Sequence, residues 1–133
     1  AKAAAYSVNP DFAIVCEATT AADISGVDGE KQVCTLGKGA VVGFMDHRTM
    51  YDRELYRLAF QTAEECGIPC QTKTMVAGGN DAGAIHTSRG GVRTIAVSIP
   101  CRYLHSPSCV IQKEDMNSCL ELVRALIPRI QTL

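Results

Sequence analysis

Short continuous apolar runs recur along this chain and predict buried strands. Residues 12–16 and 40–45 are runs of this kind, and residues 92–99 form a third that is rich in β-branched side chains. We expect Pro100 to end that third strand. A weaker alternation over residues 70–77 predicts one more strand.

Between these runs, apolar residues recur at helical spacing. Residues 51–66 and residues 114–130 carry the two clear repeats and predict long helices. Residues 1–6 are typical of the end of a helix. Residues 82–87 predict a short helix, and we expect the Asp81 carboxylate to cap its first turn. Strands that alternate with helices predict an α/β domain, a mostly parallel sheet flanked by helices on both faces.

Composition narrows the class of protein. A chain of 133 residues can bury one core, and a hydrophobic content of 47% with 20% charged residues is typical of a globular domain. The net charge of −1, without a Lys/Arg cluster, argues against nucleic acid as a partner. No apolar run approaches the ~20 residues that cross a bilayer, so we expect no membrane partner. The seven cysteines form no Cys-x-x-Cys pair, which favours reduced thiols in a cytoplasmic protein.

Two residues that could bind a metal follow predicted strands. Glu17 closes the run 12–16, and His105 lies in the loop beyond Pro100, between an aromatic residue and a Ser-Pro pair. In open α/β sheets, sites gather at the carboxyl ends of strands, and both carboxylate and imidazole bind zinc-like ions. Asp23 in the following loop is an equal alternative to Glu17.

Other polar groups are weaker candidates. The segment Gly78-Gly79-Asn80-Asp81 predicts a tight strand-to-helix turn in which the backbone can approach a ligand, although it matches no phosphate-binding fingerprint. Residues 46–48 could form a polar site cluster, but a turn is the stronger interpretation. His86 is interpreted as a packed surface histidine rather than a ligand. Cys101 and Cys109 flank the His105 loop, with no adjacent general base to support nucleophilic catalysis.

Four segments together resemble one enzyme family. They are Leu36-Gly37-Lys38-Gly39, Ile68-Pro69-Cys70-Gln71, Gly78-Gly79-Asn80-Asp81-Ala82-Gly83-Ala84-Ile85-His86 and Ile99-Pro100-Cys101-Arg102-Tyr103-Leu104-His105-Ser106-Pro107. Their order and spacing resemble the C-terminal part of the glutamyl-aminopeptidase and tetrahedral-aminopeptidase family, some members of which carry the name cellulase M. The resemblance covers nearly the whole chain.

The resemblance implies a specific activity. Such enzymes remove an amino-terminal residue from a peptide substrate with two divalent metal ions, usually zinc or cobalt. By position, His105 matches a C-terminal histidine metal ligand, and Glu17 matches an acidic ligand where many relatives have Asp. Thr20, Met75, Gly78 and Gly79 fall where relatives line the pocket for the substrate's first side chain.

The family's remaining ligands have no match in this chain. They are an earlier histidine, a bridging aspartate and a pair of adjacent glutamates that includes the general base, and we expect all of them upstream of Ala1. Residues 1–133 are therefore expected to be the C-terminal portion of a zinc-peptidase-like catalytic domain. We expect this portion to be inactive alone, and the complete enzyme to form a homo-oligomer.

Two alternatives belong to other classes. The chain could instead be a non-catalytic fragment or assembly module, in which case exposed apolar surface would favour self-association. Cellulose hydrolysis has little support, because no pair of carboxylates that could flank a sugar bond is evident and the chain contains no tryptophan.

Overall fold

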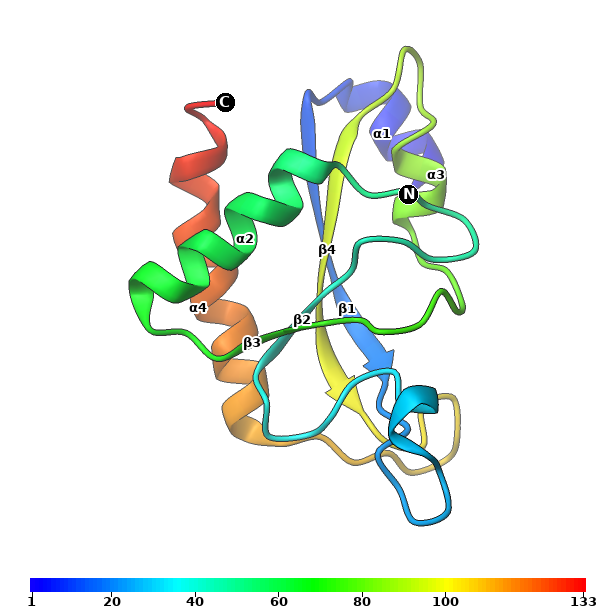
Figure 1. The fold of residues 1–133 in the computed structure, drawn as a ribbon. Coiled ribbons are helices and arrows are strands. Elements are labelled where there is room, and N and C mark those ends of the chain that lie inside the picture. The colour runs from blue at the N-terminus through cyan, green and yellow to red at the C-terminus, as the bar shows by residue number, and fades with distance from the viewer.

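The computed structural model describes the backbone of residues 1–133 and every side chain except that of Glu30. Four strands, four α-helices and one 3-10 helix make up the described chain (Figure 1). In chain order they are α1 (Lys2–Val8), β1 (Phe12–Thr20), η1 (Gly29–Lys31), β2 (Ala40–Val42), α2 (Arg53–Cys66), β3 (Cys70–Thr72), α3 (Ala82–Ile85), β4 (Arg93–Cys101) and α4 (Lys113–Ile130).

The strands form one mixed sheet in the order β1-β4-β2-β3. β1 runs parallel to β4 from the pair Phe12–Arg93 to the pair Thr20–Cys101, and β2 runs parallel to β3. Among the strands that the structure describes in this sheet, β2 and β4 are the one antiparallel pair. The predicted α/β fold with a mostly parallel sheet is thus confirmed.

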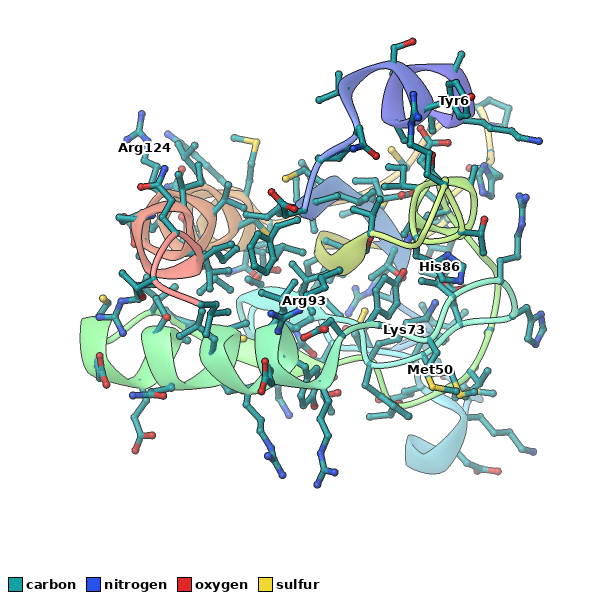
Figure 2. All side chains as sticks on the ribbon, turned by 90° about the horizontal axis from the view of Figure 1, so that it is seen from above. Tyr6, Met50, Lys73, His86, Arg93 and Arg124 are labelled. Carbon is teal, nitrogen blue, oxygen red and sulfur yellow. The ribbon has the colours of Figure 1, made fainter. Side chains whose placement is uncertain are left out.

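Helices lie on both faces of this sheet (Figures 1 and 2). α2 and α4 pack against each other and against β4, whereas α3 contacts β1 and β4 from the other side and α1 packs on α3. The core between the sheet and the two long helices includes the fully buried side chains of Leu55, Ile95, Leu122 and Leu126. Within the described part of the chain, no helix is both long enough and apolar enough to cross a membrane.

Strand β4 runs further than its sequence pattern predicts. Pro100 does not end the strand, because it still pairs with Thr19, and Cys101 pairs with Thr20. β2 pairs with β4 only at Ser98 and Val97, so beyond Ser98 the strand has β1 as its only neighbour in the sheet. A proline is tolerated in such a stretch, since its missing N–H can face the unpaired side. β1 likewise extends past the predicted residues 12–16 to Thr20.

Three other elements end earlier than predicted, and α2 begins at Arg53, two residues later than predicted. β2 ends at Val42, β3 ends at Thr72, and α3 ends at Ile85. After β2 and β3 the chain turns away from the sheet into loops 43–52 and 73–81. Apolar residues continue into these loops, which is why the sequence pattern predicted longer strands. These two loops, together with the ends of β1 and β4, surround the candidate site.

A buried carboxylate fixes the turn that leads into β2. Asp115, in the first turn of α4, accepts hydrogen bonds from the backbone N–H groups of Gly37 at 2.8 Å and Gly39 at 2.7 Å. Gly39 has a φ of +84°, and a Cβ at this position would lie 2.0 Å from the carbonyl oxygen of Pro69. Only glycine fits here, and the same carbonyl accepts a hydrogen bond from the N–H of Ala40 at 3.0 Å.

Candidate functional site

A cavity of about 310 Å³ lies near the carboxyl ends of β1 and β4. It opens on the sheet face away from α4, where Ala96 and Ser98 of β4 contribute to its lining. The remaining lining residues are Glu17, Ala18, Thr19, Thr20, Val33, Val41, Gly43, Asp46, Tyr51, Lys73, Ala77, Gly78, Gly79, Asn80, Leu104 and His105. The cavity thus collects groups from both long strands, from Val41 of β2 and from four loops.

Glu17 and His105 line this same cavity. Glu17 lies in the second half of strand β1, His105 lies in the loop beyond β4, and both residues are exposed. The loop reaches the cavity through an unusual backbone, because Tyr103 and His105 have φ values of +60° and +64°. The structure therefore brings together the carboxylate and the imidazole that the sequence suggested, whereas their metal-binding roles stay predictions.

The surroundings of Glu17 disfavour its negative charge. Partial burial is the largest effect that raises the pKa of its carboxyl group, and the nearby carboxylates of Asp81 and Asp46 raise the pKa further. The backbone N–H of Asp81 and the positive charge of Lys73 act in the opposite direction. Figure 2 shows Lys73 on the side of the sheet away from α4. A divalent cation beside Glu17 would relieve this clustering of negative charge.

Asp23, the alternative to Glu17, is engaged elsewhere. Its two carboxylate oxygens accept hydrogen bonds from Arg102 Nε and Nη2, both at 2.8 Å, and Oδ2 also accepts the N–H of Leu36 at 2.9 Å. The Arg102 guanidinium holds the pKa of this carboxyl below its usual range. This pair fixes the loop after β1 to the end of β4. Of the two carboxylates, Glu17 is the one that lines the cavity.

A chain of hydrogen bonds supports the cavity wall. Asn80 Nδ2 donates to the Tyr51 hydroxyl at 2.7 Å, and that hydroxyl donates to Asp46 Oδ2 at 2.7 Å. Asp46 Oδ1 accepts the backbone N–H groups of Arg48 and Thr49, both at 2.8 Å, as expected of the predicted turn. The sequence pattern did not single out Tyr51, because its apolar spacing predicts only a helix position.

Asn80, rather than Asp81, holds the start of α3. The predicted cap by Asp81 is wrong: no side-chain hydrogen bond from Asp81 caps the helix, and Asn80 Oδ1 instead accepts the N–H of Ala82 at 2.8 Å. The Asp81 side chain stays exposed and acts on Glu17 through its charge. An asparagine can cap in this way while its amide NH₂ bonds elsewhere, which an aspartate cannot do.

The glycine turn is packed against a side chain of the chain itself. A Cβ at Gly79 would lie 2.7 Å from Arg48 Cδ, and a Cβ at Gly83 would lie 2.8 Å from Arg48 Cβ. The carbonyl oxygen of Gly78 also accepts the N–H of His47 at 3.0 Å. The close approach predicted for this turn is therefore made by Arg48, and the turn and the loop before α2 form one wall of the cavity.

The other predicted site residues divide into two groups. Thr20, Gly78 and Gly79 line the cavity, whereas Met75 lies outside its described lining and is half-buried. The His86 imidazole has a hydrogen-bonding partner one turn earlier in the chain, since its Nδ1 lies 2.8 Å from the carbonyl oxygen of Ala82. Figure 2 shows His86 on the same side of the sheet as Lys73.

Two potential ligands do not make a complete metal site. Among the side chains that the structure describes, no group of three His, Cys, Asp or Glu residues is arranged to hold a metal ion. Glu17 and His105 nevertheless provide oxygen and nitrogen donors of the kind that zinc and other first-row ions accept. The donor set is chemically suitable but needs further ligands.

Known proteins match this chain over nearly its whole length. The family model of the M42 glutamyl aminopeptidases matches residues 1–122. The lysyl aminopeptidase of Pyrococcus furiosus is 30% identical over 134 aligned positions, which cover 100% of this chain and 37% of that protein. A solved TET aminopeptidase from a marine sediment archaeon, Thaumarchaeota archaeon SCGC AB-539-E09, is 31% identical with a TM-score of 0.92, covering 96% of this chain and 36% of that one.

A further solved relative is described by its assembly. The TET1 peptidase of Pyrococcus horikoshii, which can assemble into a tetrahedron or a large octahedral shell, is 31% identical with a TM-score of 0.76. The match covers 94% of this chain and 35% of that protein. This chain thus spans about a third of the length of the relatives it matches. By sequence and by fold, the chain belongs to the M42 glutamyl aminopeptidase family.

Proposed function

We propose that residues 1–133 are the C-terminal portion of the catalytic domain of a metal-dependent aminopeptidase, which removes amino-terminal residues from peptides. The observation that carries this proposal is the meeting of Glu17 and His105 in one cavity, in a chain of the M42 family. Both residues come from the carboxyl-end side of parallel strands, where α/β enzymes place their sites.

In this proposal Glu17 and His105 each contribute one ligand to a pair of divalent ions, zinc or cobalt. When bound, such a pair activates a water molecule and polarises the scissile carbonyl. The left-handed backbone at His105 presents the imidazole at the cavity, and the charge of Lys73 moderates the acidic surroundings of Glu17. Asp23 stays in its ion pair with Arg102 and takes no part as a ligand.

The pocket for the first side chain of the substrate is proposed within the same cavity. Thr20, Gly78 and Gly79 line that region, and Met75 lies in the same loop as the two glycines. The bond between Asn80 and Tyr51 and the packing of Arg48 on Gly79 would keep this wall in place when a peptide enters. A preformed wall lowers the ordering cost of binding.

The remainder of the enzyme would supply the general base and the other metal ligands. Relatives about three times as long as this chain support that view. An apolar groove also supports that view. It has a volume of about 290 Å³ and lies between the edge strand β1 and helix α4, on the sheet face opposite the cavity. Met116, Cys119 and Leu120 of α4 line this groove, and we infer that the rest of the protein packs near it.

Two further properties are part of the proposal. The complete enzyme is expected to form a homo-oligomer, as the Pyrococcus horikoshii relative does when it assembles into a tetrahedron or shell. A cytoplasmic location is supported by the seven cysteines, all of which are free thiols in the structure.

A peptidase assay separates this proposal from a non-catalytic role. The isolated chain, supplied with zinc or cobalt, is expected to release no amino acid from short peptides, because it holds two of the expected ligands and no matched base. The complete polypeptide, assayed in parallel, is expected to turn over the same peptides. Robust turnover by the isolated chain would contradict the division of the site.

An inactive complete polypeptide would favour the alternative, an assembly module without enzymatic activity. Light scattering shows whether each form assembles, and the peptidase assay distinguishes the two cases. Under the aminopeptidase proposal the complete protein assembles and is active, whereas under the alternative it assembles without turning over any peptide.

A further inference from the structure

The loop that carries His105 has a cysteine at each side of its neck. Arg102 and Val110 close this neck by exchanging both backbone hydrogen bonds, with N–H to oxygen contacts of 2.9 and 3.1 Å. Cys101 directly precedes Arg102, and Cys109 directly precedes Val110. Because successive side chains of an extended pair alternate between its two sides, the two cysteines lie on the same side, diagonally across this antiparallel bridge.

The two thiols are close but differ in exposure. Cys101, the last residue of β4, is 1% exposed, whereas Cys109 is exposed to solvent. The Cys109 thiol lies near enough to influence the pKa of the Cys101 thiol, whose Sγ donates to the carbonyl oxygen of Arg102 at 3.5 Å. Burial, with a smaller contribution from Cys109, raises the pKa of the Cys101 thiol. A buried thiol of this kind is a poor first target for an oxidant, and the exposed one is the better target.

We propose that Cys101 and Cys109 form a modification site, at which a hydroperoxide converts the two thiols into a disulfide across the neck of the His105 loop. This inference goes beyond the proposed aminopeptidase function and does not depend on it. It requires only that the neck has the geometry described here.

The reaction is balanced by one equivalent of peroxide. The Cys109 thiolate attacks one peroxide oxygen, an S–O bond forms while the O–O bond breaks, and the other oxygen leaves as water after protonation. The Cys101 sulfur then attacks the resulting sulfenic acid, an S–S bond forms, the S–O bond breaks and a second water leaves. Two thiols are oxidised by two electrons, and one hydrogen peroxide is reduced to two waters.

The link would close a loop whose backbone is already unusual. Tyr103 and His105 are both non-glycine residues in the left-handed region. Such residues persist where the surrounding structure determines them, and here the two hydrogen bonds at the neck connect the ends of the loop. A disulfide at that neck would add a covalent connection to them.

Peptide mapping of the folded 133-residue chain tests this proposal. After treatment with equimolar hydrogen peroxide, the chain is denatured, alkylated with iodoacetamide and digested with trypsin without reduction. Cleavage after Arg93, Arg102 and Lys113 places Cys101 in peptide 94–102 and Cys109 in peptide 103–113. The expected result is a linked pair of these peptides, lighter than their sum by two hydrogens, with loss of alkylation at both cysteines and full recovery after reduction.

Two variants sharpen the result. Cys109→Ser changes an exposed residue and should abolish the linked pair, while Cys66→Ser changes another exposed cysteine and should leave it intact. The proposal is overturned if Cys109 ends as sulfinic or sulfonic acid, or linked to another cysteine, while Cys101 stays open to alkylation. It is also overturned if the link forms only when peroxide is added to the denatured chain.

Discussion

Replacing His105 with alanine in the complete enzyme is expected to reduce aminopeptidase activity by about a hundredfold or more. His105 lines the same cavity as Glu17, and the proposal assigns its imidazole as a metal ligand. Even groups that only orient a metal ligand are worth about 10- to 100-fold in affinity or activity, so loss of the ligand should cost at least as much. Activity should be measured together with metal content per chain, and both are expected to fall.

Two control variants separate chemistry from folding. His47→Ala removes an exposed imidazole whose residue contacts the Gly78 carbonyl only through its backbone, so activity should be retained. His105→Asn keeps a residue type that tolerates the left-handed backbone at this position, so the melting temperature should change little while activity is still lost. Full activity in His105→Ala, or an equal loss in His47→Ala, would contradict the assigned role.

Gly39→Ala is expected to destabilise the folded chain by more than about 4 kcal/mol, enough to prevent folding of a marginally stable domain. The added methyl group would meet the carbonyl oxygen of Pro69 at 2.0 Å and its carbon at 2.3 Å. Relief would require moving the turn that Asp115 holds through the N–H of Gly39. The free energy of unfolding should be measured by urea denaturation followed by circular dichroism.

Gly26→Ala is the matched control for this prediction. Gly26 has a φ of +86°, nearly the same as Gly39, but nothing lies within 4 Å of the Cβ that would be added. Its substitution should cost only the left-handed backbone penalty, about 1–2 kcal/mol. Equal losses for the two variants would show that backbone conformation, and not the contact with Pro69, governs the turn before β2.

Much of this fold could be predicted because its elements carry local signals. The apolar run beginning at Phe12 and the helical repeats in α2 and α4 appear in the structure as predicted. Glu17 and His105 could be predicted to line one cavity because parallel strands bring their carboxyl ends together, although the sequence left Asp23 as an equal alternative to Glu17. The family resemblance, carried by four short segments, is likewise confirmed.

The features that sequence reasoning missed depend on contacts between distant segments. Continuation of β4 through Pro100 depends on β2 being short and antiparallel, which no local pattern encodes. The choice between Asp23 and Glu17 turns on Arg102, which lies far along the chain from both. The hydrogen bonds from Asn80 to Tyr51 and from Tyr51 to Asp46 join two loops, so neither loop alone predicts them.

The central claim is that Glu17 and His105 bind metal in one shared site of the complete enzyme. Anomalous X-ray diffraction at the zinc absorption edge, on crystals of the complete polypeptide loaded with zinc, tests it most directly. We expect two neighbouring zinc peaks in the cavity, with the His105 imidazole and the Glu17 carboxylate each coordinating one of them. Zinc peaks elsewhere, with these two side chains left uncoordinated, would contradict it.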